Sequence, residues 1–301
     1  MPKSLISIQD FTKDEILHIL EVAKEFEANR EQNFLAGKVV ACLFFEPSTR
    51  TRLSFETAVN RLGARVIGFP DNRNTSQSKG VTLEDTIKIV SNYVDMIVMR
   101  HPMAGAADIA ASVASVPVIN AGDGANQHPT QTILDLYAIQ KTQGRLEGLD
   151  VNMVGDLKYG RAVHSLVDAL RHFNPRFTFT SPDELTMPKK YLEMLDKDAI
   201  PYRQVSRIEE GLNECDILYM TRVQQERFPD MDEYNKVKDV YRLTASMLGG
   251  VRPGMKVMHP LPRVGEIAED VDSTPYAYYF QQAGGGMYVR MAIISYLLGY
   301  R

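Results

Sequence analysis

The sequence predicts an α/β protein made of two doubly wound parallel-sheet domains joined by long helices. Short apolar runs alternate with segments of helical periodicity along most of the chain, which is the pattern of repeated βαβ units. The 301 residues suit two domains of about 150 residues each. With 44% hydrophobic and 24% charged residues, the chain can bury a substantial core in each domain.

The first half of the chain contains four candidate strands, each an apolar run followed by a polar or glycine-containing segment. They are 39–45, 64–69, 96–99 and 116–119. The spacing of apolar residues predicts helices after Thr12, over 48–63, over 82–94, between the last two strands, and from Pro129 to Gln143. Thr12 and Glu15 have the spacing of a capping box, and proline is favoured at the first helical position. This order of elements predicts a parallel sheet in the first half.

The second half repeats the alternation without repeating the sequence. Its candidate strands are 151–156, 176–180, 217–220 and 255–259, with helical segments between them. No low-complexity linker separates the halves, and 143–150 is the boundary that the pattern favours. A second parallel sheet is therefore expected after this boundary.

Composition and charge exclude several classes of protein. The formal net charge is −4, whereas nucleic-acid-binding domains are usually basic. No segment approaches the ~18 apolar residues of a membrane span, and the N-terminus lacks the pattern of a signal peptide. Cys42 and Cys215 lie in or beside apolar runs, as core residues do, and no cluster has metal-ligand spacing. We expect a cytoplasmic protein with no cofactor and no contact with nucleic acid or membrane.

Basic and hydrogen-bonding side chains follow six of the candidate strands. They are Glu46 to Arg52, Arg100, His128 with Gln131, Arg161, Arg222 with Gln224, and Pro260 to Arg263. Ligands of open parallel sheets bind beyond the carboxyl ends of the strands, so these groups are expected to converge on an anion. The alternative is that strand ends are simply polar and solvated. That alternative explains any one arginine equally well, but it does not explain basic or hydrogen-bonding groups at six strand ends together.

The segment Pro47 to Thr51 is the sharpest local feature. Ser48 and Thr49 are favourable N-cap residues, and the free N–H groups of a helix start attract phosphate. Arg50 adds a planar fork that can bind phosphate oxygens with two hydrogen bonds. A plain N-cap beside a solvated arginine is the alternative. The chain has no GxxxxGK[ST], and neither VGDLKYG nor the glycines at 284–286 fit a GxGxxG after a strand, which argues against a nicotinamide dehydrogenase.

The segment 71–80 is polar and about ten residues long. Loops of this kind are often functional. Ser76 and Lys79 could reach an anion from it. On composition alone, a solvated surface loop explains the segment better.

Several segments together resemble one family. They are FFEPSTRTRLSFE, VMRHP, NAGDGANQHPTQT, VGDLKYGRAVHSL, YMTRVQQERF and HPLPR. In this order they closely resemble the catalytic chains of aspartate carbamoyltransferases, from LISIQDF to the final helix. The resemblance implies a carbamoyl phosphate-binding domain over 1–133 with the C-terminal helix 286–301, and an aspartate-binding domain over 134–285. HPLPR replaces the HCLP segment typical of ornithine carbamoyltransferases, and arginines in the second half suit a dicarboxylate.

The resemblance also implies roles for single residues. Those expected to bind carbamoyl phosphate are Ser48, Thr49, Arg50, Thr51, Arg100, His128, Gln131, Pro260, Leu261 and Pro262. Among them Arg50, Thr51, Arg100 and His128 are the candidate catalytic residues. For His128 two simpler roles stay open, a helix cap and a core residue whose hydrogen bonds are satisfied. Those expected to bind aspartate are Arg161, Arg222, Gln224 and Lys79, with Ser76 and Lys79 supplied by a neighbouring subunit. Glu46, Arg161 and Arg227 are implied as ion-pair partners on domain closure.

The resemblance further implies a homotrimer with shared active sites. The family often adds a separate zinc-containing regulatory chain, and the sequence leaves open whether this chain has one. Two other classes also stay open: a chain that binds carbamoyl phosphate without turnover, and a scaffolding chain of a larger complex. No Ser–His or Cys–His pair is apparent, and carbamoyl phosphate is already activated, so no covalent nucleophile is expected.

Overall fold

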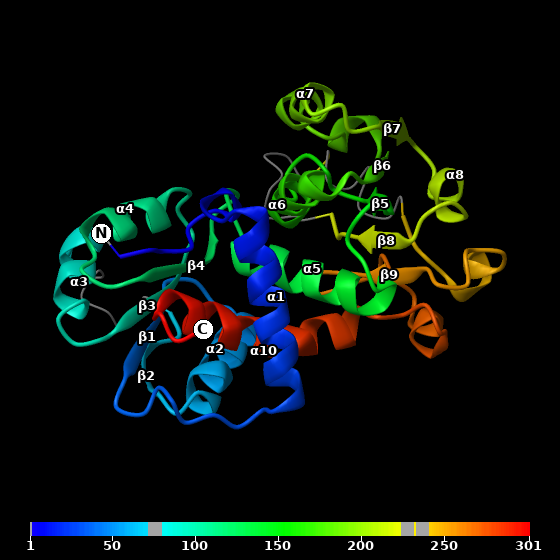
Figure 1. Cartoon of the computed structure of the whole chain (residues 1–301). Coiled ribbons are helices and arrows are strands. Elements are labelled where there is room, and N and C mark those ends of the chain that lie inside the picture. The colour runs from blue at the N-terminus through cyan, green and yellow to red at the C-terminus, as the bar shows by residue number, and fades with distance from the viewer. Residues whose placement is uncertain (1, 72–79, 224–231, 233–240) are drawn as a thin grey trace. The chain divides into compact units, whose positions relative to one another are not determined.

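The computed structural model describes residues 2–71, 80–223, 232 and 241–301 and divides into two compact units (Figure 1). Unit 1 comprises Met1–Tyr137 and Gly285–Arg301, and unit 2 comprises Ala138–Gly284. The helices α5 (Pro129–Gln143) and α10 (Tyr279–Leu297) each continue from one unit into the other. Unit 1 is therefore discontinuous in sequence, and α10 completes it.

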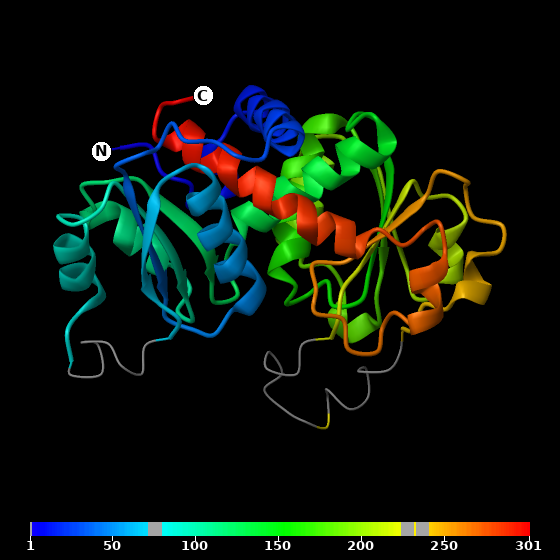
Figure 2. The ribbon, with the colours of Figure 1, turned by 90° about the horizontal axis from the view of Figure 1, so that it is seen from below.

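Unit 1 contains a four-stranded parallel sheet in the order β2-β1-β3-β4. The strands are β1 (Val39–Phe44), β2 (Arg65–Phe69), β3 (Met96–His101) and β4 (Val118–Asp123). Its helices, besides α5 and α10, are α1 (Lys13–Ala28), α2 (Thr49–Arg61), α3 (Leu83–Val90) and α4 (Ala106–Val113), with a 3-10 turn η1 (Ile8–Asp10). Figure 2 shows α2 and the C-terminal part of α10 in this unit from a second side.

Local sequence signals explain several boundaries in unit 1. The capping box predicted for α1 is present, because the N–H of Thr12 donates to Glu15 at 2.9 Å and the Thr12 hydroxyl accepts from the N–H of Glu15 at 3.3 Å. At the edge of the sheet, Leu5 pairs with β4: its N–H donates to Val118 at 2.9 Å and its carbonyl accepts from Asn120 at 2.8 Å. The N-terminal segment thus covers the edge of β4 that no strand pairs with.

Unit 2 contains a five-stranded parallel sheet in the order β7-β6-β5-β8-β9. The strands are β5 (Asp150–Val154), β6 (Arg176–Thr180), β7 (Tyr202–Val205), β8 (Ile217–Met220) and β9 (Lys256–Met258). Its helices are α6 (Arg161–Leu170), α7 (Lys189–Lys197) and α8 (Glu209–Leu212), with 3-10 turns η3 (Arg171–Phe173), η4 (Asp183–Leu185), η6 (Ala245–Leu248) and η7 (Glu269–Ser273). The two parallel sheets confirm the predicted α/β class.

The largest differences from the prediction concern the fourth strand, the strand β7 and the helix α3, which ends at Val90 although a helix was expected over 82–94. The fourth strand, Val118–Asp123, begins two residues after the start of the apolar run and ends four residues beyond it, because Asn120 and Asp123 are buried among polar partners. The strand β7 was not predicted, since the side chains of an edge strand stay partly solvated and leave no apolar pattern.

Cys42 and Cys215 are buried and unpaired, and burial raises the pKa of each thiol to about 12. No helix in the described part of the chain is both long enough and apolar enough to cross a membrane.

Candidate active site

The start of α2 is the first part of the candidate site. Ser48 occupies the N-cap with an extended backbone, but its side chain makes no capping hydrogen bond, and the first turn of α2 carries no acidic residue. Neither the N-cap side chain nor an acidic residue of the first turn therefore compensates the positive end of this helix. Arg50 is exposed, whereas Thr51 is only 9% exposed. This turn is chemically suited to a phosphate group.

Arg100 lies at the carboxyl end of β3, next to the end of β1. Its Nε donates to the Glu46 carboxylate at 2.8 Å, and its Nη1 donates to the carbonyl of Ala121 at 3.4 Å. Phe44 of β1 is in register with Arg100 of β3, so the phosphate turn and this guanidinium start from neighbouring strand ends. The structure thus gives Glu46 a partner within unit 1. Its predicted ion pairs with Arg161 and Arg227 on domain closure stay predictions.

A buried carboxylate shapes the segment after β4. Asp123 is fully buried and accepts from the side chains of Asn120 and Asn126 at 2.9 and 3.0 Å, and from the N–H groups of Gly105 and Gln127 at 2.8 and 3.0 Å. These four hydrogen bonds fix the turn that leads from β4 to the start of α5. The turn delivers His128 and Gln131 to the same end of the sheet as Arg100.

His128 and Gln131 are both 8% exposed. The His128 carbonyl accepts from the N–H groups of Gln131 and Thr132 at 3.0 and 3.2 Å, so its backbone starts α5. The Gln131 amide donates to Asp135 at 2.9 Å. His128 therefore does start the helix, but it does so through its backbone carbonyl. This role leaves the imidazole available for a contact with substrate.

In unit 2, two arginines follow neighbouring strands. Arg161 is the first residue of α6, after β5, and Arg222 is the second residue after β8. The backbones that follow these two strands approach each other closely at Gly155 (φ 116°), where a Cβ atom would lie 2.3 Å from the carbonyl oxygen of Thr221. Only glycine fits this approach, so the contact keeps the starting points of both arginines close. Two guanidinium groups from adjacent strands suit a dicarboxylate.

The loop after β9 is tied by a buried histidine and a buried glutamate. The His259 Nδ1 accepts from the N–H of Leu261 at 2.7 Å, so Nε2 carries the proton and donates to Glu266 at 2.6 Å. The second oxygen of Glu266 accepts from the N–H groups of Val264 and Gly265 at 3.0 and 2.9 Å. The Leu261–Pro262 peptide is cis and Leu261 has a φ of 50°. This closed set of contacts holds the Pro260 to Pro262 backbone in one conformation.

Burial and hydrogen bonding set the charge states of this pair. Burial opposes ionisation of Glu266, but hydrogen bonds from His259 and the N–H of Gly265 overcome it and lower the pKa of the carboxyl group to about 2. Burial lowers the pKa of His259, although Glu266 acts in the opposite direction, and the positive charge of Arg222 lowers it further. At neutral pH the pair is a neutral imidazole and a carboxylate. This loop and the end of β8 start from neighbouring strands, because β8 pairs with β9.

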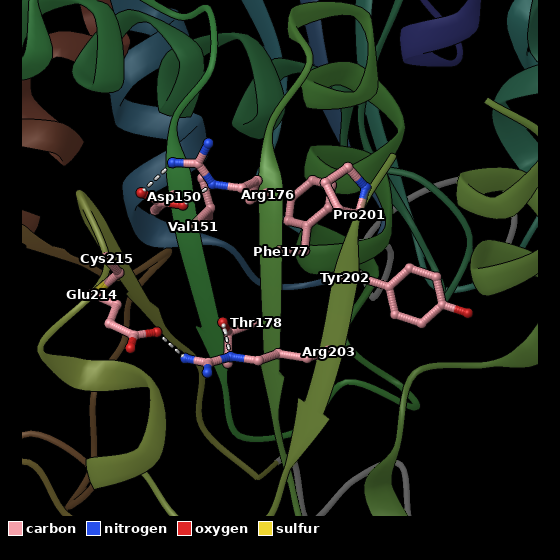
Figure 3. A pocket seen from close by; sticks show the side chains of 10 residues that line it. All are labelled: Asp150, Val151, Arg176, Phe177, Thr178, Pro201, Tyr202, Arg203, Glu214 and Cys215. Atoms are coloured by element: carbon pink, nitrogen blue, oxygen red, sulfur yellow. Dashed lines mark hydrogen bonds and ion pairs between the residues drawn. The ribbon is translucent and has the colours of Figure 1, made fainter. Parts of the chain in front are cut away.

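A pocket of about 300 Å³ lies elsewhere, at the amino ends of β5, β6 and β7 (Figure 3). Its arginines are held by their own carboxylates: Arg176 makes two hydrogen bonds to Asp150, at 2.6 and 2.8 Å, and Arg203 binds Glu214 at 2.6 Å. The charges of these two pairs cancel, and the residues predicted to bind substrate do not line this pocket. We therefore assign it no part in the site.

Four predicted site residues, Ser76, Lys79, Gln224 and Arg227, lie outside the described residues. Among the described residues no group of three or more histidine, cysteine, aspartate or glutamate side chains is placed to hold a metal ion. Asp123, His259 and Glu266 support the candidate site but were not singled out from the sequence. Their partners are backbone groups or residues several positions away, and no spacing rule marks them.

Family models match both halves of the chain. The aspartate/ornithine carbamoyltransferase carbamoyl-P binding domain matches residues 3–141, and the Asp/Orn binding domain of the same enzymes matches residues 147–297. The aspartate carbamoyltransferase catalytic subunit of Phocaeicola vulgatus is 60% identical over 298 residues, which cover 99% of this chain and 95% of the relative. That of Chromobacterium violaceum is 56% identical and covers 98% of each chain.

Solved structures agree with these matches. The catalytic subunit of M. jannaschii aspartate transcarbamoylase superposes with a TM-score of 0.92 at 49% identity, covering 99% of this chain and 98% of that one. Aspartate transcarbamoylase from Trypanosoma cruzi, in complex with carbamoyl phosphate and aspartate, superposes with a TM-score of 0.93 at 36% identity, covering 97% and 96%. On this evidence, together with the order of elements and the basic strand ends, the chain belongs to the aspartate/ornithine carbamoyltransferase family.

Proposed function

We propose that this chain transfers the carbamoyl group of carbamoyl phosphate to the amine of L-aspartate, an early step of de novo pyrimidine biosynthesis. The products are N-carbamoyl-L-aspartate and phosphate. The observation that carries the proposal is the set of basic residues at the strand ends of this chain. A protein of the same family, aspartate transcarbamoylase from Trypanosoma cruzi, was solved in complex with both substrates. Both substrates are anions, and fixed arginine charges compensate such anions best.

In unit 1, the proposed carbamoyl phosphate contacts begin at α2. The N–H groups and side chains of Ser48 to Thr51 bind the phosphate, and Arg100 spans the phosphate and the carbonyl oxygen. His128 and Gln131 contact the carbamoyl group. This role of unit 1 is supported by the uncapped, acid-free start of α2 and by the register that sets Arg100 beside it.

In unit 2, Arg161 and Arg222 are proposed to bind the two aspartate carboxylates, with Gln224 in support. The backbone of Pro260, Leu261 and Pro262 is proposed to accept from the carbamoyl NH₂ group. The rigid loop held by His259 and Glu266 supports this, because a fixed carbonyl acceptor costs little to order when substrate binds.

The proposed chemistry needs no covalent intermediate. The neutral amine of aspartate attacks the carbamoyl carbon, and the carbonyl oxygen takes up negative charge opposite Thr51, Arg100 and His128. The bond from carbon to the phosphate oxygen then breaks, and the departing phosphate takes the proton that the amine loses. Removing one donor to such an oxyanion typically lowers the rate ~100 to 1,000-fold.

The decisive experiment is turnover by the purified chain. We expect formation of carbamoyl aspartate and phosphate in equal amounts from carbamoyl phosphate and aspartate, and no citrulline when ornithine replaces aspartate. Tight binding of carbamoyl phosphate without product would mean a binding protein. Preference for ornithine would assign the chain to the other activity of the family.

We propose a homotrimer in which Ser76 and Lys79 serve the active site of a neighbouring chain. Lys79→Ala and Arg50→Ala chains should each be inactive alone. Mixed trimers should regain part of the activity, because some interfaces pair an intact Lys79 with an intact Arg50. Native mass spectrometry verifies that mixed trimers have formed. If these trimers show no more activity than either parent, Lys79 lies in the pocket of its own chain.

A regulatory partner and a cytoplasmic location belong to the same proposal. The relatives are named as catalytic subunits, which implies a second kind of chain for them. Co-purification of the native complex, followed by zinc analysis, tests for such a chain. Fractionation of the source cells tests the location.

A further inference from the structure

The helix α10 carries a buried cation that the proposed chemistry does not use. Arg290 is only 4% exposed, although a charged side chain is rarely buried without a carboxylate partner. Its Nη1 donates to the hydroxyl of Ser54 on α2 at 3.1 Å, and its guanidinium lies 5.0 Å from the centre of the Phe55 ring. A hydroxyl and an aromatic face are weak compensation for a buried charge.

The environment of Arg290 shows what this burial costs. Burial lowers the pKa of the guanidinium to about 10, and Asp135 on α5 only partly opposes this. The Nε atom is buried and finds no hydrogen-bond partner among the described residues. A neutral side chain of similar length would be easier to bury, so packing alone does not explain the arginine.

The sequence of α10 makes room for this side chain. Long side chains on a helix fold back over the preceding turn, which here brings the guanidinium over Gly286. A Cβ atom at Gly286 would lie 2.4 Å from Nη1 of Arg290. At Gly284, two residues earlier, a Cβ atom would meet nothing within 4 Å. Gly286 and Arg290 therefore form a matched pair within α10.

The partners of Arg290 belong to the two helices that begin at the candidate phosphate and carbamoyl contacts. Ser54 is one turn beyond Arg50 on the same face of α2. Asp135, which is fully buried, accepts from the side chain of Gln131 at 2.9 Å on α5. One buried charge thus acts on α2 through Ser54 and on Gln131 through Asp135.

We propose that Arg290 is a positioning residue for the carbamoyl phosphate half of the site. Its Ser54 contact fixes the start of α2, its charge orients Asp135 and through it Gln131, and its positive potential adds to that of the helix start. The proposal rests on the proposed function, because it concerns the same phosphate contacts. It assigns Arg290 no contact with substrate.

The test compares Gly286→Ala with Gly284→Ala, and Arg290→Met with Arg171→Met. Arg171 is a partly buried arginine of unit 2 that pairs with Asp168 and Asp198. Calorimetry measures the dissociation constant of inorganic phosphate without requiring turnover, and steady-state kinetics gives KM for each substrate. A unit charge about 10 Å away in a medium of effective dielectric about 20 changes an affinity roughly tenfold.

We therefore expect Arg290→Met and Gly286→Ala to raise the phosphate dissociation constant and KM for carbamoyl phosphate about tenfold, with KM for aspartate changed less than twofold. Ser54→Ala should give part of this effect and Arg290→Lys should retain part of the affinity. Gly284→Ala and Arg171→Met should bind phosphate as the wild type does.

The outcomes separate the two proposals. A wild type that neither binds phosphate nor turns over would defeat the proposed function. If the wild type binds phosphate and both Arg290→Met and Gly286→Ala bind it with the same affinity, the proposed role of Arg290 is overturned and the proposed function is not. If Arg290→Met does not fold, the same comparison is decided by Gly286→Ala and Ser54→Ala. Lower melting temperatures without any change in phosphate affinity would show that Arg290 is only structural.

Discussion

Replacing Glu266 by glutamine should loosen the loop that carries Pro260 to Pro262. The carboxylate accepts three hydrogen bonds, from His259 at 2.6 Å and from the N–H groups of Val264 and Gly265 at 3.0 and 2.9 Å. Glutamine keeps the shape but removes the charge, and its NH₂ group faces donors where an acceptor is needed. The change therefore removes the charge together with at least one of the three hydrogen bonds.

The magnitude follows from the pKa of Glu266. A decrease from 4.5 to about 2 corresponds to roughly 3 kcal/mol in favour of the folded state. Partial solvation reduces this figure, so we expect Glu266→Gln to lower the free energy of unfolding by about 2 kcal/mol at pH 7. The folded-state pKa lies below the unfolded value, so the stabilisation is present above pH 4.5 and is lost as the pH falls towards about 2.

Urea titration at pH 7, 5 and 3.5 measures this effect. The difference between wild type and Glu266→Gln should be the same at pH 7 and 5 and smaller at pH 3.5, and KM for carbamoyl phosphate should rise. Glu214→Gln is the matched control: Glu214 is paired with Arg203, but its side chain is 69% exposed, so its loss should cost less than about 1 kcal/mol. Equal destabilisation by both variants, or a difference that does not depend on pH, would refute the reasoning.

Three further predictions concern single residues. Arg50→Ala should weaken the binding of inorganic phosphate, measured by calorimetry, more than it weakens the binding of aspartate. An unchanged affinity for phosphate would mean that the phosphate site is not at α2. Arg222→Ala should cost ~2–5 kcal/mol in aspartate recognition while phosphate binding survives; near-normal turnover at low aspartate would contradict this. Burial lowers the pKa of His164 to about 4, against the hydrogen bond to the Leu157 carbonyl at 2.7 Å. The unfolded chain therefore takes up a proton on His164 at a higher pH than the folded chain does. Between pH 7 and 5, urea titration should show that the free energy of unfolding of the wild type falls by roughly 2 kcal/mol more than that of His164→Gln. Equal decreases in the two proteins would mean that His164 does not titrate in this range.

Apolar runs located buried strands well and exposed strands poorly. Strands β6 and β8 occur at the predicted residues 176–180 and 217–220, because a central strand buries both faces. The edge strand β7 escaped prediction because its side chains are partly solvated. The pairing of Leu5 with β4 was not predicted for another reason, because a single bridging residue gives no periodic pattern in the sequence.

The same physical limit applies to the site. Residues such as Arg100 and Arg222 could be proposed from the sequence because a parallel sheet gathers its strand ends on one side. Glu266 and Arg290 could not, because each acts through partners that only the folded chain brings near. Ser54 lies 236 positions from Arg290 in the sequence. Motifs therefore indicate the groups that face substrate, and tertiary structure is needed to find the groups that hold them.

The discontinuity of unit 1 has a consequence for biosynthesis. Its last segment, Gly285–Arg301, is made only after all of Ala138–Gly284, a delay of roughly 7–30 s at ~5–20 residues per second. Unit 2 is continuous in sequence, so no later segment is needed to complete it, although it is second in the chain. The half that begins synthesis first is thus finished last, and until α10 arrives the Ser54 face of α2 has no Arg290 to bind. A nascent chain stopped at Gly284 should resist proteases in unit 2 and be cleaved in unit 1.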